Sequence, residues 1–546
     1  MDSRPQAVAH DRVYLMVSRA LTRTICFWIA ASVGIWQAWT MRFVQDDAYI
    51  SFRYAENLVR GHGLVWNVGE RVEGYTNFLW TLLLVIPHAI GWDVESFAIG
   101  LGLVLFTATL AVFYALTAGL TGSWITATAA TLTLGAFPTF AAFATGGLET
   151  QLQAFLVVVT LSVVIREIRA NDISAVAAGA LGTSAALAVL TRIDSVVLIL
   201  PMLAVYVVVC VSRLGWRRAF LSPATAVPLS IWSAWLAWKL AYYGAILPNS
   251  YQAKVEGLGN LTRQGARFVV SFVQAYSFYL PLACVPAGAW LAWERRIDRR
   301  AAAAILIPLM LWTAYVVSVG GDFMEYRFLV SSIPLAFLLT YWVMSEIDGN
   351  RARAALVTTL VLAGGAVTYR SKVPKPPGSP LPLRELAVTN DQEWYEVGTV
   401  LHDAFQGSVR PSIAVIPAGV IPYRSQLRSV DMLGLNDPDV RSFIHLPYEL
   451  VGHRRLAPLA LLEKRGINFL IGSPFVRTPR PLGMRFRYDE FARRPYAYSD
   501  EHRLKGRTLI EMPLPHNRIL LMVYLTEDPA LTLRLDQLGW RRYALE

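Results

Sequence analysis

The sequence predicts an α-helical protein that spans a membrane about eleven times and carries an α/β domain at its C-terminal end. Of its 546 residues, 55% are hydrophobic and only 16% are charged, whereas soluble globular proteins carry about 25% charged residues. Several apolar runs approach the ~20 residues with which a helix crosses a bilayer. This composition excludes a disordered chain and disfavours an ordinary cytosolic enzyme.

The formal net charge of +11 would also suit a nucleic-acid-binding protein. The basic residues are mostly arginines in short clusters between apolar runs, which is how membrane proteins mark their cytoplasmic side. We therefore expect membrane lipids as partners and no nucleic acid. Cys26, Cys210 and Cys284 lie inside apolar runs, so no disulfide framework or cysteine zinc site is expected in the polar C-terminal part.

The first apolar run, 21–39, follows several arginines and is long for the core of a signal peptide. No small-x-small cleavage site follows it, so it predicts an uncleaved first span with a cytoplasmic N-terminus. The polar and aromatic segment 42–94 is then the first outer loop. The further span candidates are 95–119, 123–144, 149–168, 172–190, 194–212, 220–242, 268–291, 300–319, 326–345 and 352–369.

The arginine clusters between these runs decide which loops are cytoplasmic. They allow only one crossing between Gly74 and Thr121, for which the runs 78–91 and 95–119 compete. The first run is short and contains Pro87, so we predict a helix at the outer interface there. The odd number of spans then places the C-terminal part outside a bacterial plasma membrane.

The domain organisation follows from a change in composition near residue 370. Residues 1–370 form the predicted transmembrane domain, and residues 371–546 form an extracytoplasmic domain that opens with a proline-rich linker, 373–383. A helix-like segment and β-branched runs alternate in this domain, which favours a small α/β fold. These segments are 391–405, 412–416, 467–471 and 518–525.

The first outer loop carries the clearest chemical signal. Asp46 and Asp47 follow the first span directly, with Tyr49 and Arg53 at helical spacing behind them. A carboxylate within reach of a hydroxyl can accept its proton, so either aspartate is a candidate general base. The alternatives are a solvated loop and, for Asp47, an N-cap of a helix that starts near Ala48.

Short islands elsewhere fall on the same predicted outer face. With the first-loop segments 46–50, 61–63 and 70–76, they are Gly147-Leu148-Glu149-Thr150, Arg192-Ile193-Asp194, Tyr242-Tyr243-Gly244, Pro248-Asn249-Ser250 and Gly321-Asp322-Phe323-Met324. Together they resemble the GT-C glycosyltransferases, most closely the terminal (β-1,2) arabinofuranosyltransferase family of mycobacteria and its bacterial relatives. The resemblance continues weakly into the C-terminal part through 431–437.

This resemblance implies a polyprenyl-phosphate sugar as donor, either decaprenyl-phosphate arabinofuranose or a close pentofuranosyl relative, and a cell-envelope glycan as acceptor. It puts the base role on Asp46 and a second acidic position on Glu149. The candidates for binding sugar hydroxyls are Glu73, Tyr75 and Asn77. Further substrate-binding candidates in or beside the islands are Tyr49, Asp194, Tyr243, Asn249 and Asp322.

A lipid phosphate that leaves needs cationic groups at the outer interface. The candidates are Arg53, Arg192, Lys254 and Arg327. Simpler explanations compete with this role: Arg192 would pair with Asp194, Arg327 would pair with Asp322, and Lys254 would only reach the headgroups.

No cofactor is required by the sequence. If the protein uses a divalent cation, the carboxylates of Asp46, Asp47 and Glu149 would coordinate it. Two rival functions remain open: a GT-C paralogue with another lipid-linked sugar or a protein acceptor, and a transporter or flippase of lipid-linked sugars. A transporter would show broken, charged spans near mid-membrane and internal symmetry, whereas the polar islands here gather on one face.

Overall fold

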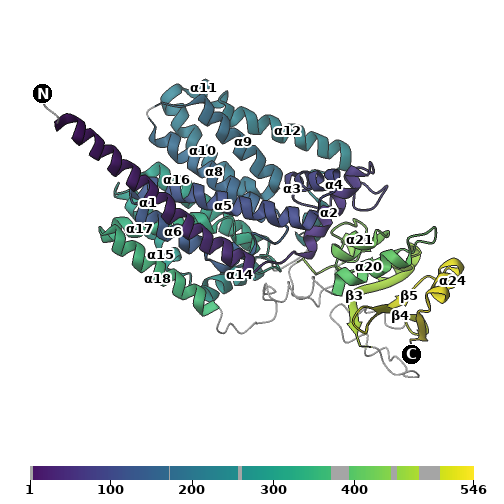
Figure 1. Ribbon diagram of the computed structural model, residues 1–546. Helices are drawn as coiled ribbons and strands as arrows, with labels where there is room; N and C mark the ends of the chain where they lie inside the picture. Colours follow the sequence, from purple (N-terminus) through teal and green to yellow (C-terminus); the bar gives the residue numbers. More distant parts are fainter. Residues whose placement is uncertain are drawn as a thin grey trace.

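The computed structural model describes residues 4–170, 172–255, 261–369, 393–443, 452–478 and 504–545. A bundle of long helices forms one part of the molecule, and a sheet with flanking helices forms the other, at one end of the bundle (Figure 1). The first helix extends well beyond the bundle on the side away from the sheet. The predicted linker 373–383 and the start of the helix predicted over 391–405 lie outside the described residues.

The helices of the bundle follow the apolar runs of the sequence. They are α1 (Arg4–Thr40), α5 (Val94–Thr121), α6 (Trp124–Gly135), α8 (Thr150–Arg169), α9 (Ala175–Thr191), α10 (Val196–Leu214), α12 (Pro223–Tyr243), α14 (Leu261–Ala275), α15 (Tyr279–Trp293), α16 (Arg299–Ser318), α17 (Ile333–Asp348) and α18 (Arg351–Tyr369). The helices of the connecting segments are α2 (Asp46–Val59), α3 (Phe78–Leu83), α4 (Val85–Ile90), α7 (Pro138–Ala142), η1 (Ile193–Ser195), α11 (Trp216–Phe220), α13 (Asn249–Val255) and η2 (Arg327–Leu329).

The bundle is that of a multi-pass membrane protein. Among the described residues, four helical stretches are long and apolar enough to cross a membrane: Val94–Thr121, Thr150–Arg169, Ile193–Leu214 and Arg299–Ser318. The predicted outer-interface segment 78–91 is helical, as the two short helices α3 and α4. The total of eleven spans and the side on which each terminus lies stay predictions.

Two predicted spans are not single straight helices. The run 268–291 is divided between α14 and α15, which meet at an angle of 107°. Ser277, between them, has a left-handed backbone with φ of 47°, which interrupts the helical hydrogen bonding. The run 123–144 ends as α6 at Gly135, and Pro138 begins the separate helix α7, because proline suits a first helical turn but not a helix interior.

The C-terminal part is a six-stranded sheet in the order β2-β1-β3-β5-β4-β6. β1 pairs in parallel with β2 and β3, while the other pairs are antiparallel. The strands are β1 (Ile413–Val415), β2 (Ser429–Asp431), β3 (Phe469–Arg477), β4 (Thr508–Leu514), β5 (Arg518–Tyr524) and β6 (Arg541–Ala544). The helices are α20 (Tyr395–Ala404), α21 (Val420–Ser425), η4 (Val440–Ser442), α22 (Leu459–Lys464) and α24 (Pro529–Leu538).

Both faces of this sheet are buried, and β5 shows why. Ile519, Leu521 and Val523 pack into one apolar cluster with α22, while Leu520 and Met522 pack into another with α20 and α24. Successive residues of a strand point to opposite faces, so a continuous apolar run suits a sheet covered on both sides. The predicted α/β domain is therefore confirmed as a fold.

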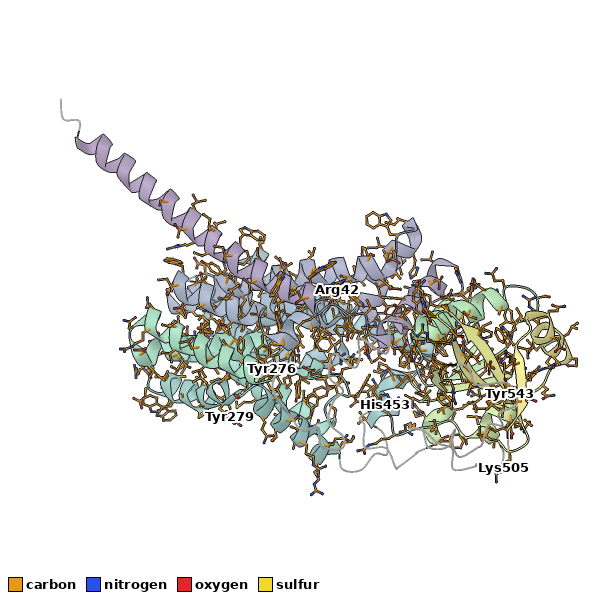
Figure 2. All side chains as sticks on the ribbon, turned by 60° about the horizontal axis from the view of Figure 1, so that its bottom comes forward. Arg42, Tyr276, Tyr279, His453, Lys505 and Tyr543 are labelled. Atoms are coloured by element: carbon orange, nitrogen blue, oxygen red, sulfur yellow. The ribbon has the colours of Figure 1, made fainter. Side chains whose placement is uncertain are left out.

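The helical part and the C-terminal domain adjoin (Figure 2), and apolar side chains pack across their boundary. Val420 of α21 belongs to the main core of the helical bundle, and Ala418 packs into a cluster with Tyr54 and Trp66 of the first outer loop. The His453 ring lies 4.8 Å from the Phe323 ring, between the two parts. The C-terminal domain thus packs against the helical part.

Candidate functional site

Two adjoining compartments lie where the first outer loop, α13 and the loop before η2 meet the C-terminal domain. The larger encloses about 680 Å³ of empty space and the smaller about 420 Å³, part of it open to solvent. Thr76, Ser250, Lys254 and Arg327 line both compartments, so the two form one continuous site.

The adjacent carboxylates of the first outer loop have different surroundings. The helix α2 begins at Asp46, with Gln45 as its N-cap residue, so the alternative of Asp47 as an N-cap is wrong. Asp47 lines the smaller compartment with 21% of its side chain exposed, and its carboxylate lies 4.0 Å from the Arg327 guanidinium. Asp47 is therefore open to a ligand.

Asp46 is buried and turned toward the C-terminal domain. Its carboxylate accepts hydrogen bonds from the backbone N–H groups of Gly419, at 3.0 Å, and Val420, at 2.8 Å. Burial raises the pKa of Asp46 to about 7, although these hydrogen bonds oppose the rise. It does not line either compartment among the described residues, so the expectation that Asp46 contacts the reacting hydroxyl disagrees with this geometry.

Glu149 sits at the floor of the smaller compartment, just before α8. Its carboxylate accepts from Arg192 Nη1 at 2.7 Å and from Asn77 Nδ2 at 2.8 Å. Burial would raise the pKa of Glu149, but the Arg192 and Arg327 charges outweigh it and hold the pKa below its usual range. The predicted second acidic position and Asn77 thus lie in the site.

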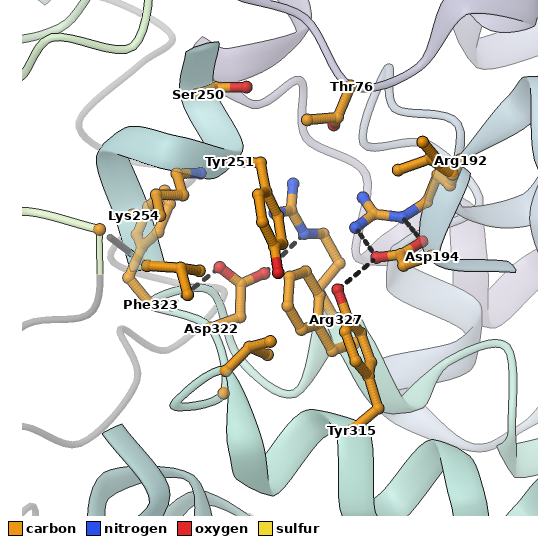
Figure 3. Close-up of a pocket in the computed structure, with 16 residues that line it drawn as sticks. Thr76, Arg192, Asp194, Ser250, Tyr251, Lys254, Tyr315, Asp322, Phe323 and Arg327 are labelled. Atoms are coloured by element: carbon orange, nitrogen blue, oxygen red, sulfur yellow. Dashed lines mark hydrogen bonds and ion pairs between the residues drawn. The ribbon is translucent and has the colours of Figure 1, made fainter. Parts of the chain in front are cut away.

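The larger compartment contains the two buried arginines. Arg192 forms a two-pronged ion pair with Asp194, with N–O distances of 3.0 and 2.6 Å, and Arg327 Nε lies 2.6 Å from Asp322 Oδ2. The local ion pairs considered from the sequence are therefore present, and all four side chains still line the compartment. Figure 3 shows both guanidinium groups pointing into the space that Tyr251 and Lys254 enter from α13.

Lys254 and Ser250 are the polar residues of this wall with the fewest protein partners among the described residues. The Lys254 ammonium lies 5.8 Å from the Phe323 ring centre, and no carboxylate of the described residues lies within ion-pair distance of it. The Ser250 hydroxyl is buried and has no hydrogen-bond partner among the described residues. A buried hydroxyl without a partner is costly, which is consistent with a polar ligand at this position.

Several predicted substrate-binding residues serve the structure instead. Arg53 is buried and donates to the carbonyls of Trp66, Pro422 and Leu427, so its guanidinium is not available to a lipid phosphate. Tyr49 packs between aromatic rings of α2 and α21. Neither lines the compartments among the described residues.

Glu73, Tyr243 and Asn249 likewise face neighbouring protein groups. Glu73 pairs at 2.9 Å with Lys239, which is fully buried in α12, and burial raises the pKa of Glu73 to about 7. The Tyr243 hydroxyl donates to the Leu64 carbonyl at 2.8 Å. Asn249 donates to two carbonyls of the C-terminal domain.

The structure also adds site residues that the sequence reasoning missed. Tyr315, from the middle of an apolar run, donates to Asp194 at 3.3 Å, and Phe328 lies beside both guanidinium groups, 5.1 Å from Arg192 and 5.5 Å from Arg327. Leu435 and Gly452 of the C-terminal domain complete the walls. Ser250 belonged to a recognised island, but Tyr315 and Gly452 carried no signal in the sequence.

The carboxylates do not suit a divalent cation. In the described residues, no group of three or more histidine, cysteine, aspartate or glutamate side chains is placed to hold a metal. Of the predicted ligands, Asp46 faces backbone N–H groups and Glu149 faces Arg192, so only Asp47 points freely into the compartment. The charges that would balance these carboxylates are guanidinium groups.

The arrangement of helices and sheet is that of the GT-C fold. Over 92% of this chain and 99% of the other, the structure matches ArnT from Cupriavidus metallidurans bound to undecaprenyl phosphate, with a TM-score of 0.56 and 13% identity. It also matches the apo oligosaccharyltransferase of Archaeoglobus fulgidus, over 91% of this chain and 76% of that chain, with a TM-score of 0.54 and 12% identity.

In sequence, the chain is similar to the terminal beta-(1->2)-arabinofuranosyltransferase of Mycobacterium tuberculosis, with 30% identity over 337 residues, 56% of this chain and 52% of that protein. The enzyme of the same name from Corynebacterium glutamicum is 28% identical over 346 residues, 57% of this chain and 50% of that protein. The chain spans about half the length of these curated relatives. Residues 384–505 match a family model described as a domain of unknown function, DUF8728.

Proposed function

We propose that this protein is a membrane glycosyltransferase that moves a sugar from a polyprenyl phosphate to a cell-envelope glycan. The observation that carries this proposal is the continuous site in which the open carboxylate of Asp47 faces the cationic wall formed by Arg327 and Lys254. A base and anion-binding groups that line one cavity are what glycosyl transfer from a lipid phosphate needs.

In the proposed reaction, Asp47 accepts the proton of the acceptor hydroxyl. The hydroxyl oxygen forms a bond to the anomeric carbon, and the bond from that carbon to the phosphate oxygen breaks. The electron pair of that bond leaves with the polyprenyl phosphate. Lys254, the free face of Arg327 and the Ser250 hydroxyl stabilise the charge on this leaving group, because charge-assisted hydrogen bonds strengthen as the charge develops.

The ion pair between Glu149 and Arg192 stabilises the wall of the smaller compartment. Asn77 donates to Glu149, accepts from the Ser51 hydroxyl at 3.0 Å and thereby ties this wall to α2, which carries Asp47. Asn77 and Asp194 are the groups we assign to the sugar hydroxyls, because both line the site. Asn77 retains one amide N–H to donate and the Asp194 carboxylate retains lone pairs to accept. No step of this scheme passes through a metal ion.

The identity of the substrates is supported by the similar proteins. ArnT, whose fold this chain shares, was solved with undecaprenyl phosphate, and the curated relatives are named arabinofuranosyltransferases. We propose arabinofuranose on decaprenyl phosphate as the donor. We also propose domains at 1–370 and 371–546, with the site and the C-terminal domain on the outer face of the plasma membrane and the N-terminus in the cytoplasm.

An in vitro transfer assay with the purified full chain tests this function. The protein is given decaprenyl-phosphate arabinofuranose, other polyprenyl-phosphate sugars and sugar nucleotides, with arabinan fragments and acceptor peptides offered in parallel. Transfer of arabinose to the glycan, abolished in Asp47→Asn, is the expected result. Transfer of another sugar or to a peptide would identify a paralogue, and flipping of the lipid without transfer would replace the enzyme by a transporter.

A further inference from the structure

The short helix α13 carries the groups to which we assign the donor phosphate, and it is held at both ends by the C-terminal domain. At its first residue, Asn249 Nδ2 donates to the carbonyls of Gly434, at 2.8 Å, and Leu435, at 2.9 Å. Near its last residue, the Ala253 carbonyl accepts from Arg455 Nε at 2.6 Å. Between these ends, Ser250 and Lys254 face the site.

The part of the C-terminal domain that holds Asn249 is itself a fixed turn. The Asp431 carboxylate accepts from the backbone N–H groups of Leu433, at 2.9 Å, and Asn436, at 2.8 Å, and from the Asn436 side chain at 3.0 Å. Asn436 Oδ1 lies 3.3 Å from the Tyr54 hydroxyl of α2. The turn therefore links α13 to the helix that carries Asp47.

Two further contacts also hold α13 in place. The Asn249 N–H donates to the Glu73 carbonyl at 2.8 Å, which fastens α13 to the first outer loop as well. A Cβ atom at Gly452 would lie 3.3 Å from Lys254 Cε, so the C-terminal backbone packs directly against the lysine stem. A helix of seven residues has little stability of its own, so these partners determine where Lys254 points.

We infer that Asn249 and Arg455 are positioning residues for the donor phosphate, and that the C-terminal domain is an integral wall of the donor site. They act by fixing α13 so that the Ser250 hydroxyl and the Lys254 ammonium converge on the phosphate. This inference rests on the proposed function, in which those two groups bind the leaving phosphate. Misplacing such groups by about 1 Å costs binding and rate even when every reacting residue is intact.

The test measures binding and catalysis separately in the purified full chain. In Asn249→Ala, we expect the apparent Kd for decaprenyl phosphate and the KM for the lipid-linked donor to rise about tenfold, because α13 loses the two hydrogen bonds that hold its first residue. The kcat at saturating donor should fall less than in Asp47→Asn, since the base is untouched and Ser250 and Lys254 are misplaced rather than removed.

Asn67→Ala is the matched control. Asn67 lies in the first outer loop and donates to the Ser429 carbonyl of the C-terminal domain at 2.8 Å, without contacting α13. It should leave the decaprenyl phosphate Kd within about twofold of wild type. Equal losses of binding in Asn67→Ala and Asn249→Ala would show a general loosening of the two parts and would overturn the inference.

The double variant Asn249→Ala/Lys254→Ala distinguishes a failure of the positioning role from a failure of the proposed phosphate site. Because Asn249 acts in part through Lys254, the double variant should bind only slightly more weakly than Lys254→Ala alone, through the misplaced Ser250, and fully additive losses contradict the inference. If Lys254→Ala alone does not weaken binding, the proposed phosphate site itself fails. Should Asn249→Ala not fold, Arg455→Lys loosens the other end of α13 with its charge kept, and wild-type binding by that variant refutes the positioning role.

Discussion

At the scale of single residues, the adjacent Asp46 and Asp47 show how neighbours in sequence acquire different roles. Successive side chains of a helix project about 100° apart, so α2 sends one carboxylate toward the C-terminal domain and the other into the site. The sequence identified both as candidates. It could not choose between them, because the groups that occupy Asp46 come from residues 419 and 420.

The first prediction separates these two aspartates. Asp47→Asn keeps the size of the side chain but removes the base, so kcat should fall by ~10²–10⁴ with little change in melting temperature. Asp46→Asn should mainly change the melting temperature, since its carboxylate joins the two parts of the molecule. Steady-state transfer kinetics and thermal unfolding of both variants check this, and a wild-type kcat in Asp47→Asn would return the base role to Asp46.

The second prediction concerns Lys254. An ammonium beside a phosphate contributes roughly 1.5–3 kcal/mol, so Lys254→Ala should lower kcat/KM for the lipid-linked donor about 10- to 100-fold. Lys254→Arg should recover part of the loss, because the charge returns with a different shape. Donor titrations measure both. Unchanged kinetics in the two variants would mean that Lys254 only reaches the lipid headgroups.

The arginines show which part of the site could not be predicted from single residues. Arg192 and Arg327 were expected in the site and lie there, because charges at the edge of a span are costly unless they are used. Arg53 looked equivalent in sequence, yet its guanidinium is consumed by carbonyls of α21 and its flanking loop. Which arginine stays open depends on contacts between distant segments, and no local pattern records those contacts.

At the scale of elements, most apolar runs predicted helices at nearly the right places, because length and hydrophobicity dominate that signal. The bend of 107° between α14 and α15 was not predictable in the same way. Residues 268–291 read as one apolar run, and the left-handed Ser277 that divides it is not a glycine. Three strand-like runs of the C-terminal domain were recognised. Of the strands that were missed, β2 has three residues, β6 begins with two arginines, and β4 contains Glu511 and Pro513 within its apolar run.

Helix packing in the bundle gives the third prediction. A Cβ at Gly182 of α9 would collide with the Pro223 carbonyl at the start of α12, whereas a Cβ at Gly179 would meet no atom within 4 Å. Small residues let membrane helices approach closely, so Gly182→Ala should lower the melting temperature in detergent. Gly179→Ala, on the same helix, should leave it unchanged or raise it slightly, since alanine favours helices by ~1 kcal/mol. Equal effects of the two substitutions would contradict this packing.

At the scale of the whole molecule, the C-terminal domain contributes residues to the site. It must therefore lie on the same side of the membrane as Asp47. The fourth prediction is therefore topological. A reporter fused after Glu546 that is active only outside the cytoplasm should be active, and one that needs the cytoplasm should be silent. The reverse pattern would overturn the assignment of 78–91 to the outer interface and the odd number of spans with it.

The fifth prediction is a pH dependence of the packing between the C-terminal domain and the helical part. Burial raises the pKa of Asp46 to about 7 from an ordinary value of 3.8, so the folded protein binds a proton that the unfolded chain releases. The stability from this group is fully present below pH ~4 and is lost as the pH rises through about 7. The melting temperature of wild type relative to Asp46→Asn should therefore fall between pH 5 and 7.5, and a difference that is constant with pH would refute this.

The shared wall of the site has a consequence for how the protein is made. Asp47 lies in α2, whereas Leu435 and Gly452 follow α18 in the chain. A chain whose helices have all inserted still lacks the residues that hold α13 until its C-terminal domain has folded. Under the proposed function, activity appears only when membrane insertion is complete, so a stalled or truncated chain could not consume lipid-linked sugar.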